Sequence, residues 1–274
     1  MKWIMVTAMS IALLCGFKAE AQKVLVLYYS QTSNTKAVAQ EIATKLNADI
    51  EEITLVNPYN SDYQATIERS RKEREQGITP EIKPLKANIA KYDVIFLGYP
   101  IWFGTYAPPI ATWLEKVDLS GKTIVPFCTF GSGGLESSVM ILKQKQPKAE
   151  IFDGYGVRAA RMDAMPEEVR QFLIANGFLR GEAVKLEPFS AAHRVSKEDE
   201  AIFDAAVGDY PMISARALTV ASRPISNGME YLFTATEKRK GTPDKDLQLR
   251  PPKEMQVYVI VLNGQKPVFT KVVR

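Results

Sequence analysis

Six consecutive residues, Ser30–Thr35, carry the clearest sign of chemistry in the 274-residue chain, because hydroxyl and amide side chains follow one another as SQTSNT. The run Lys23–Tyr29 before them is made of β-formers, and residues 37–46 after them place apolar side chains on one helical face. N–H groups at a helix N-terminus are free, and the helix dipole favours an anion. The pattern therefore indicates a phosphate site, with an ordinary strand–turn–helix capped by Ser or Thr as the alternative.

Two further loops also follow strand-like runs and could contact a flat ligand. The apolar run Asp93–Gly98 is typical of a strand covered on both faces, and the loop Tyr99–Tyr106 after it contains Trp102. The run Lys122–Phe127 leads into Cys128–Gly134, which is rich in glycine. An indole ring offers a stacking surface, and glycines permit a close backbone approach. These two loops are therefore the candidates for the rest of the site.

Strands alternate with helices from residue 23 to 178. We expect strands at 23–29, 49–56, 93–98, 122–127 and 151–156, and helices at 37–46, 62–76, 108–116, 135–145 and 166–176. Such alternation predicts an α/β fold with a doubly wound, five-stranded parallel sheet, in which ligands lie beyond the carboxyl ends of the strands. All three loops lie on that edge.

The pattern changes after about Lys185. We expect a linker, a helix at 197–207, and two antiparallel hairpins formed by strands at 213–221 with 229–237 and at 256–262 with 267–273. The sequence thus predicts a domain at 22–184 and a smaller α+β domain at 185–274. The proline-containing insert at 238–253 is expected to be mobile.

The N-terminus has the features of a secretory signal. Lys2 precedes an apolar run, Trp3–Phe17, which is followed by small residues ending at Ala21. We predict cleavage after Ala21 and export to the periplasm or the cell exterior, with no integral membrane span afterwards. The apolar run is shorter than the roughly 20 residues of a membrane-spanning helix. A retained anchor and a lipoprotein attached at Cys15 are the alternatives.

Composition and the positions of single residues exclude some classes of function. Hydrophobic residues make up 46% of the chain, which is ample for a packed core. The net charge is +4, and the basic residues are spread along the chain and do not form the patch expected of a nucleic-acid-binding protein. After signal cleavage Cys128 is the only cysteine, and no His or acid lies near it in sequence, so we expect it in the core. Trp113 is also expected in the core, and His193 in solvent. We assign no catalytic residue and no metal ligand.

Taken together, the three loops resemble those of flavodoxins. The segment YSQTSNT at 29–35 resembles their phosphate loop, GYPIWFGT at 98–105 their flavin-stacking loop, and FCTFGSGG at 127–134 their third loop. The resemblance covers about 23–178 and implies bound FMN and electron transfer with a redox partner protein or a small electron acceptor. Carried over by position, the cofactor-binding residues would be Ser30, Thr32, Ser33, Asn34 and Thr35 at the phosphate, Pro100, Ile101, Trp102, Phe103, Gly104 and Tyr106 on one side of the ring, and Thr129, Phe130, Gly131, Gly133 and Gly134 on the other.

The chain departs from the flavodoxin pattern in two respects. Ser33 stands where many members have glycine, and residues 22–184 hold 19 basic and 19 acidic side chains, whereas flavodoxins are usually acidic. The acidic docking face of those carriers is therefore not expected. The phosphate loop has no Lys or Arg, which should lower the potential for full reduction of a bound flavin.

Two other functions stay open: an FMN-dependent NAD(P)H or quinone-type reductase, and a partner-binding module that uses the C-terminal domain. The order of elements after residue 197 looks like a cystatin-type fold. No inhibitory motif accompanies it, so protease inhibition is not expected.

Overall fold

The computed structural model describes residues 22–208, 210–211, 213–238 and 253–274. The predicted signal, with Cys15 and Ala21, and nearly all of the predicted insert lie outside these residues. In the part described, no helix is both long enough and apolar enough to cross a bilayer.

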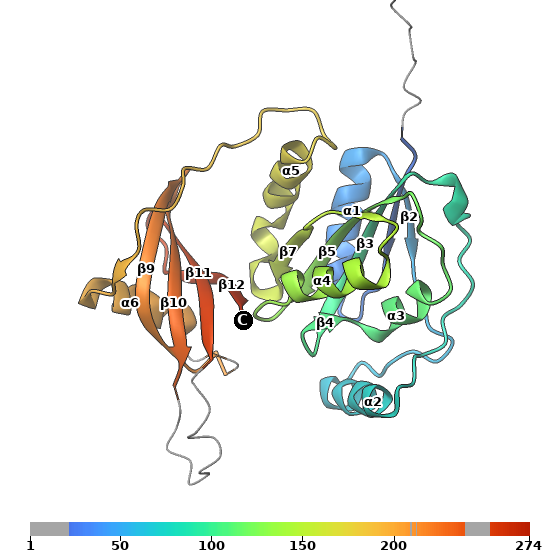
Figure 1. The fold of residues 1–274 in the computed structure, drawn as a ribbon, viewed down its shortest axis with the longest axis horizontal. Coiled ribbons are helices and arrows are strands. Elements are labelled where there is room, and N and C mark those ends of the chain that lie inside the picture. The colour runs from blue at the N-terminus through green and yellow to red at the C-terminus, as the bar shows by residue number, and fades with distance from the viewer. Residues whose placement is uncertain (1–21, 209, 212, 239–252) are drawn as a thin grey trace, which may run out of the picture.

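A parallel sheet forms the centre of the first domain (Figure 1). Its strands are β1 (Val24–Tyr28), β2 (Asp49–Glu52), β3 (Val94–Trp102), β5 (Thr123–Phe130), β6 (Glu150–Ile151) and β7 (Tyr155–Arg158). The order is β2-β1-β3-β5, and both β6 and β7 pair with β5, so together they take the fifth place. The predicted doubly wound, five-stranded sheet is confirmed.

Helices cover both faces of this sheet. They are α1 (Asn34–Leu46), α2 (Tyr63–Gln76), α3 (Pro108–Leu114), α4 (Leu135–Lys145) and α5 (Met165–Ala175), with short 3-10 turns η1 (Ile89–Lys91) and η2 (Ala159–Ala164). One core cluster joins α1 and α5 to the sheet, and a second joins α3 and α4 to the opposite face. Leu25 and Leu27 enter the second cluster and Val26 the first, as expected of a strand buried on both faces. Figure 1 shows α2 set away from the sheet, below α3.

Several predicted boundaries were wrong. The loop expected at 99–106 begins as strand, because β3 stays paired with β5 as far as Pro100 and then turns back through β4 (Thr105–Tyr106) as a hairpin. The second strand ends at Glu52 instead of residue 56. The fifth strand breaks at Gly154, where φ is +81° and a Cβ would lie 2.5 Å from the carbonyl oxygen of Pro126. The backbone passes so close to β5 there that the regular pairing is interrupted.

The second domain is one antiparallel sheet with a helix on one face. Its elements are β8 (His193–Arg194), α6 (Lys197–Val207), β9 (Ala215–Ile225), β10 (Gly228–Glu237), β11 (Glu254–Leu262) and β12 (Val268–Val273). The predicted helix and hairpins are confirmed, but the hairpins also pair with each other through β10 and β11. The expected linker contributes β8, in which His193 is exposed as predicted. Phe203 and Val207 of α6 pack on the sheet.

Candidate functional site

The loop between β1 and α1 presents an open helix N-terminus. Ser33 is the N-cap residue, has φ +66°, and makes no side-chain capping bond. The N–H of Lys36 donates to Ser30 Oγ at 3.2 Å, and Ala37 N–H is the first to reach back to the Ser33 carbonyl. Ser33 therefore provides no cap, and Ser30 Oγ satisfies only the N–H of Lys36 in the first turn. The N–H groups of Asn34 and Thr35 have no acceptor among the described residues and stay available to an anion.

The first loop is joined directly to the third. Thr35 Oγ1 and Thr129 Oγ1 lie 2.8 Å apart, and both residues are buried. Thr35 is on α1 and Thr129 near the end of β5, so this bond fixes the start of the helix against the sheet edge. These predicted site residues, distant in sequence, are thus brought together.

The second loop is a tight hairpin that carries an indole ring. Trp102 stands edge-on to Tyr29, with ring centroids 6.1 Å apart, and to Tyr59, with centroids 5.0 Å apart. Phe103 and Gly104 at the turn have φ +50° and +82°, the two consecutive positive values of a two-residue hairpin turn. Thr105 Oγ1 in the same hairpin is buried and has no hydrogen-bond partner among the described residues.

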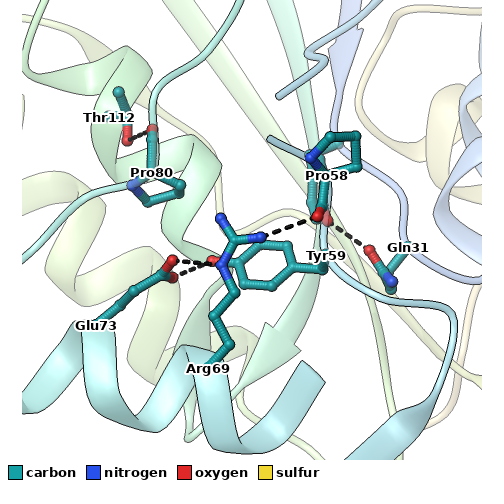
Figure 2. Close-up of polar contacts among 8 residues, drawn as sticks. Gln31, Pro58, Tyr59, Arg69, Glu73, Pro80 and Thr112 are labelled. Carbon is teal, nitrogen blue, oxygen red and sulfur yellow. Dashed lines mark hydrogen bonds and ion pairs between the residues drawn. The ribbon is translucent and has the colours of Figure 1, made fainter. Parts of the chain in front are cut away.

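Figure 2 shows a polar network that holds Tyr59, the residue whose ring lies edge-on to Trp102. Tyr59 OH donates to Glu73 Oε2 at 2.5 Å, and Arg69 Nε donates to Glu73 Oε1 at 2.8 Å. The guanidinium of Arg69 lies 4.3 Å from the Tyr59 ring centroid and also donates to the carbonyl of Pro58. Burial, helped by the bond to Glu73, raises the pKa of Tyr59 far above its ordinary value. The ring that contacts Trp102 is therefore held by its hydroxyl bond to Glu73 and by the Arg69 guanidinium over its face.

Gln31 connects this network to the first loop through two hydrogen bonds. Tyr29 OH donates to Gln31 Oε1 at 2.7 Å, and Gln31 Nε2 donates to the carbonyl of Asn60 at 2.8 Å. Sequence reasoning missed Gln31, Tyr59 and the α2 side chains, since the segment 62–76 is mostly polar and has little apolar surface to mark a packed face. The spacing of Arg69 and Glu73, four residues apart on one helical face, was the available signal.

The third loop packs against the second. Ser137 Oγ at the start of α4 donates to the carbonyl of Gly104 at 2.6 Å. Gly134 has φ +115°, and a Cβ on it would lie 2.6 Å from Ile101 Cγ2. Glycine is needed here both for the backbone angle and for the contact.

Two predicted site residues have their rings in the core. Phe130 is 5% exposed and lies against Gly156, and Tyr106 is 8% exposed with its ring centroid 5.8 Å from that of Tyr99. Their role at a ligand stays a prediction. The remaining predicted residues of the second and third loops (Pro100, Ile101, Trp102, Phe103, Gly104, Gly131, Gly133 and Gly134) are half-buried or exposed along this edge.

The remaining sequence expectations concern the core. Cys128 is fully buried, and burial raises the pKa of its thiol well above the ordinary value, so it is not poised as a nucleophile. Trp113 is 3% exposed. Both core expectations are confirmed. No cluster of three metal-binding side chains occurs among residues the structure describes.

Comparison with known proteins finds a family match for most of the first domain. The profile of the flavodoxin family matches residues 23–170, more than half of the chain. An uncharacterized protein of Methanocaldococcus jannaschii is 32% identical over 116 residues, which are 42% of this chain and 59% of that protein. The match therefore spans less than two thirds of the relative's length.

Solved flavoproteins are also similar to this chain. A putative flavoprotein from Bacteroides eggerthii is 34% identical, with a TM-score of 0.49, over 56% of this chain and 97% of its own. A flavoprotein from Lactobacillus acidophilus, solved in complex with FMN, is 23% identical, with a TM-score of 0.45, over 53% of this chain and 99% of its own.

Proposed function

Because the chain belongs to the flavodoxin family through residues 23–170, we propose that it binds FMN at the three-loop edge and transfers electrons outside the cytoplasm. The observation that carries the proposal is the open N-terminus of α1, with Ser33 left-handed and uncapped, on the same sheet edge as the Trp102 hairpin. The phosphate of FMN would lie at the helix N-terminus after β1, and its flat ring would lie beside the aromatic hairpin after the neighbouring strand β3.

The residues present fit this cofactor. Ser30, Thr32 and Asn34 offer hydroxyl and amide groups to a phosphate beside the N–H groups at the start of α1. Thr105 Oγ1, which is buried and has no hydrogen-bond partner within the described part of the chain, supplies a polar atom in the ring-binding hairpin. Bound FMN would supply reversible uptake of electrons. The chain's own part is to hold the phosphate, to support the ring with Trp102 and to exclude water from it.

Affinity for FMN compared with riboflavin tests the proposal, because riboflavin has the ring but lacks the phosphate. We expect the purified protein to be yellow, and to bind FMN much more tightly than riboflavin. The substitution Thr32→Val should weaken FMN binding and leave riboflavin binding unchanged. A protein that binds neither ligand, or that binds both equally, would refute an FMN site with its phosphate at this loop.

Export and electron transfer need separate tests. The apolar run before Ala21 supports export, and an N-terminus found at Gln22 in protein from the cell envelope or medium is the expected result. Anaerobic reductive titration should show the flavin accepting electrons in two separate one-electron stages, with a low potential for the second. A single two-electron stage would argue against a one-electron carrier. The physiological partner would be a redox protein or a small electron acceptor.

A reductase is the second candidate, and one surface feature favours it. Phe103 is 42% exposed at the hairpin turn, and the guanidinium of Arg74 lies 5.0 Å from its ring centroid. An exposed ring beside a cation could receive a planar, anionic substrate. Stopped-flow mixing of the FMN-loaded protein with NAD(P)H decides between the two: bleaching of the flavin within seconds favours the reductase, and none favours the carrier.

A further inference from the structure

The C-terminal domain reaches the third loop through its edge strand. Val272 N–H on β12 donates to the carbonyl of Ser132 at 2.7 Å. A Cβ on Gly133 would lie 2.1 Å from the carbonyl oxygen of Val272, so only glycine permits this approach. Figure 1 shows β12 as the strand of its sheet that faces the first domain. The loop expected to contact the cofactor is therefore also a docking site for residues more than 130 positions later.

Arg158 connects the same two segments. It lies at the end of β7, is 7% exposed, and donates from Nε to the carbonyl of Gly131 and from Nη1 to the carbonyl of Phe269, each at 2.8 Å. Its guanidinium lies 3.4 Å from the ring centroid of Phe269 and 5.3 Å from that of Tyr210. Burial lowers the pKa of Arg158.

Arg158 depends on its hydrogen bonds to both the Gly131 and the Phe269 carbonyls, because its guanidinium is buried. No carboxylate pairs with it among the residues that the structure describes. A buried, unpaired cation is costly unless carbonyl dipoles and an aromatic face compensate for lost water. The third loop provides one of those carbonyls, and β12 provides the other together with the Phe269 ring. Separating β12 from the loop would remove the Phe269 carbonyl and the Phe269 ring and leave the Gly131 carbonyl alone.

Two more contacts complete the interface. Lys271 Nζ lies 2.6 Å from Glu136 Oε1 in the first turn of α4, directly after the third loop. Tyr210 OH lies 2.4 Å from where a Cβ on Gly131 would be. Two of the glycines that the sequence assigned to a ligand, Gly131 and Gly133, thus also accommodate the C-terminal domain.

We propose that docking of the C-terminal domain sets the conformation of the third loop, so that FMN binding and domain docking are thermodynamically coupled, with Arg158 as the positioning residue. The inference rests on the proposed FMN site. Coupling is reciprocal: if docking favours the loop conformation that binds FMN, FMN must favour docking to the same extent.

Affinity measured on the full chain tests the first direction. Arg158→Met should weaken FMN binding by about 5- to 150-fold, the usual range of coupling between sites. Arg158→Lys, which can still donate to one or both carbonyls, should recover part of that loss. Arg170→Met is the matched control, because Arg170 pairs with Glu167 on α5 and is exposed. Loss of the buried cation should also lower the flavin's reduction potential in Arg158→Met and leave it unchanged in Arg158→Lys.

Hydrogen exchange of the Val272 amide tests the reverse direction without a change at Arg158. FMN should slow this exchange in the wild-type chain. Gly133→Ala should speed it even without FMN, because the added methyl group meets the Val272 carbonyl.

The possible results separate this inference from the proposed function. Two results would overturn the coupling while the FMN site stands, provided that the wild-type chain binds FMN. The first is that Arg158→Met binds FMN as tightly as Arg170→Met does. The second is that FMN leaves the hydrogen-exchange rate of the Val272 amide unchanged. If wild type binds no FMN, both fall.

Discussion

Tyr59→Phe is the substitution whose effect follows most directly from the structure. It removes the hydroxyl group that donates to Glu73 and keeps the ring that lies edge-on to Trp102. Glu73 is 9% exposed and, among the residues described, would then keep Arg69 as its one side-chain partner. Because a hydrogen bond to a charged group contributes about 1.5–3 kcal/mol, we expect the free energy of unfolding to fall by about that amount.

Urea unfolding measures this loss, and the same region offers a control. Tyr63 is on α2, is 71% exposed, and makes no side-chain hydrogen bond among the described residues. Tyr63→Phe should therefore change the unfolding free energy by no more than about 0.5 kcal/mol. Tyr59→Ala removes the ring as well and should cost about 3–5 kcal/mol, as is usual for a buried aromatic residue.

A double-mutant cycle of Tyr59→Phe with Glu73→Ala isolates the interaction between the two side chains, because each substitution removes one partner of the hydrogen bond. We expect a coupling energy within the range of about 0.5–3 kcal/mol found for residues in contact. FMN affinity should stay nearly unchanged in Tyr59→Phe and fall in Tyr59→Ala, because only the second loses the support of Trp102. Equal stability of Tyr59→Phe and Tyr63→Phe, or additive effects in the cycle, would refute the role given to this network.

Three further predictions concern the ring site, the core and alkaline pH. Trp102→Ala should weaken FMN binding by about 1–3 kcal/mol, the usual value of base stacking on an aromatic ring, whereas Trp102→Phe should lose less; unchanged affinity in Trp102→Ala would remove this residue from the site. Cys128 should react with a thiol reagent only after unfolding, and fast labelling of the native chain would contradict its burial. Burial raises the pKa of Tyr99 above its ordinary value of 10, so the stabilisation it contributes is complete below pH 10 and is lost as the pH rises further. Above pH 10 the unfolded phenol ionises first, and unfolding in urea should become easier with a slope of about 1.4 kcal/mol per pH unit from this group. Tyr99→Phe should flatten that decline, and equal alkaline slopes would count against the assignment.

Much of the fold was predictable, because its elements are encoded locally. The helices at 135–145 and 197–207 have the predicted bounds. In α6 the reason is visible, since Ser196 and Asp199 form a capping box at its start and Gly208 follows its end. The ends of strands were predicted less well, because the position where a strand ends depends on pairing partners that are distant in sequence. β3 continues past Gly98 since β5 is there to pair with it, and no local signal specifies that.

The sequence by itself determined the three loops, their order on one sheet edge, and the hydroxyl-rich composition of the first loop. These are properties of short segments, in which side-chain type and period act over a few residues. Only the tertiary structure decided how the loops are held: Thr35 against Thr129, Trp102 against Tyr59, and the third loop against Arg158 and β12. Each of these contacts joins residues more than 25 positions apart. Burying their polar groups costs free energy unless a hydrogen-bond partner is present, and that partner arrives only when the chain has folded.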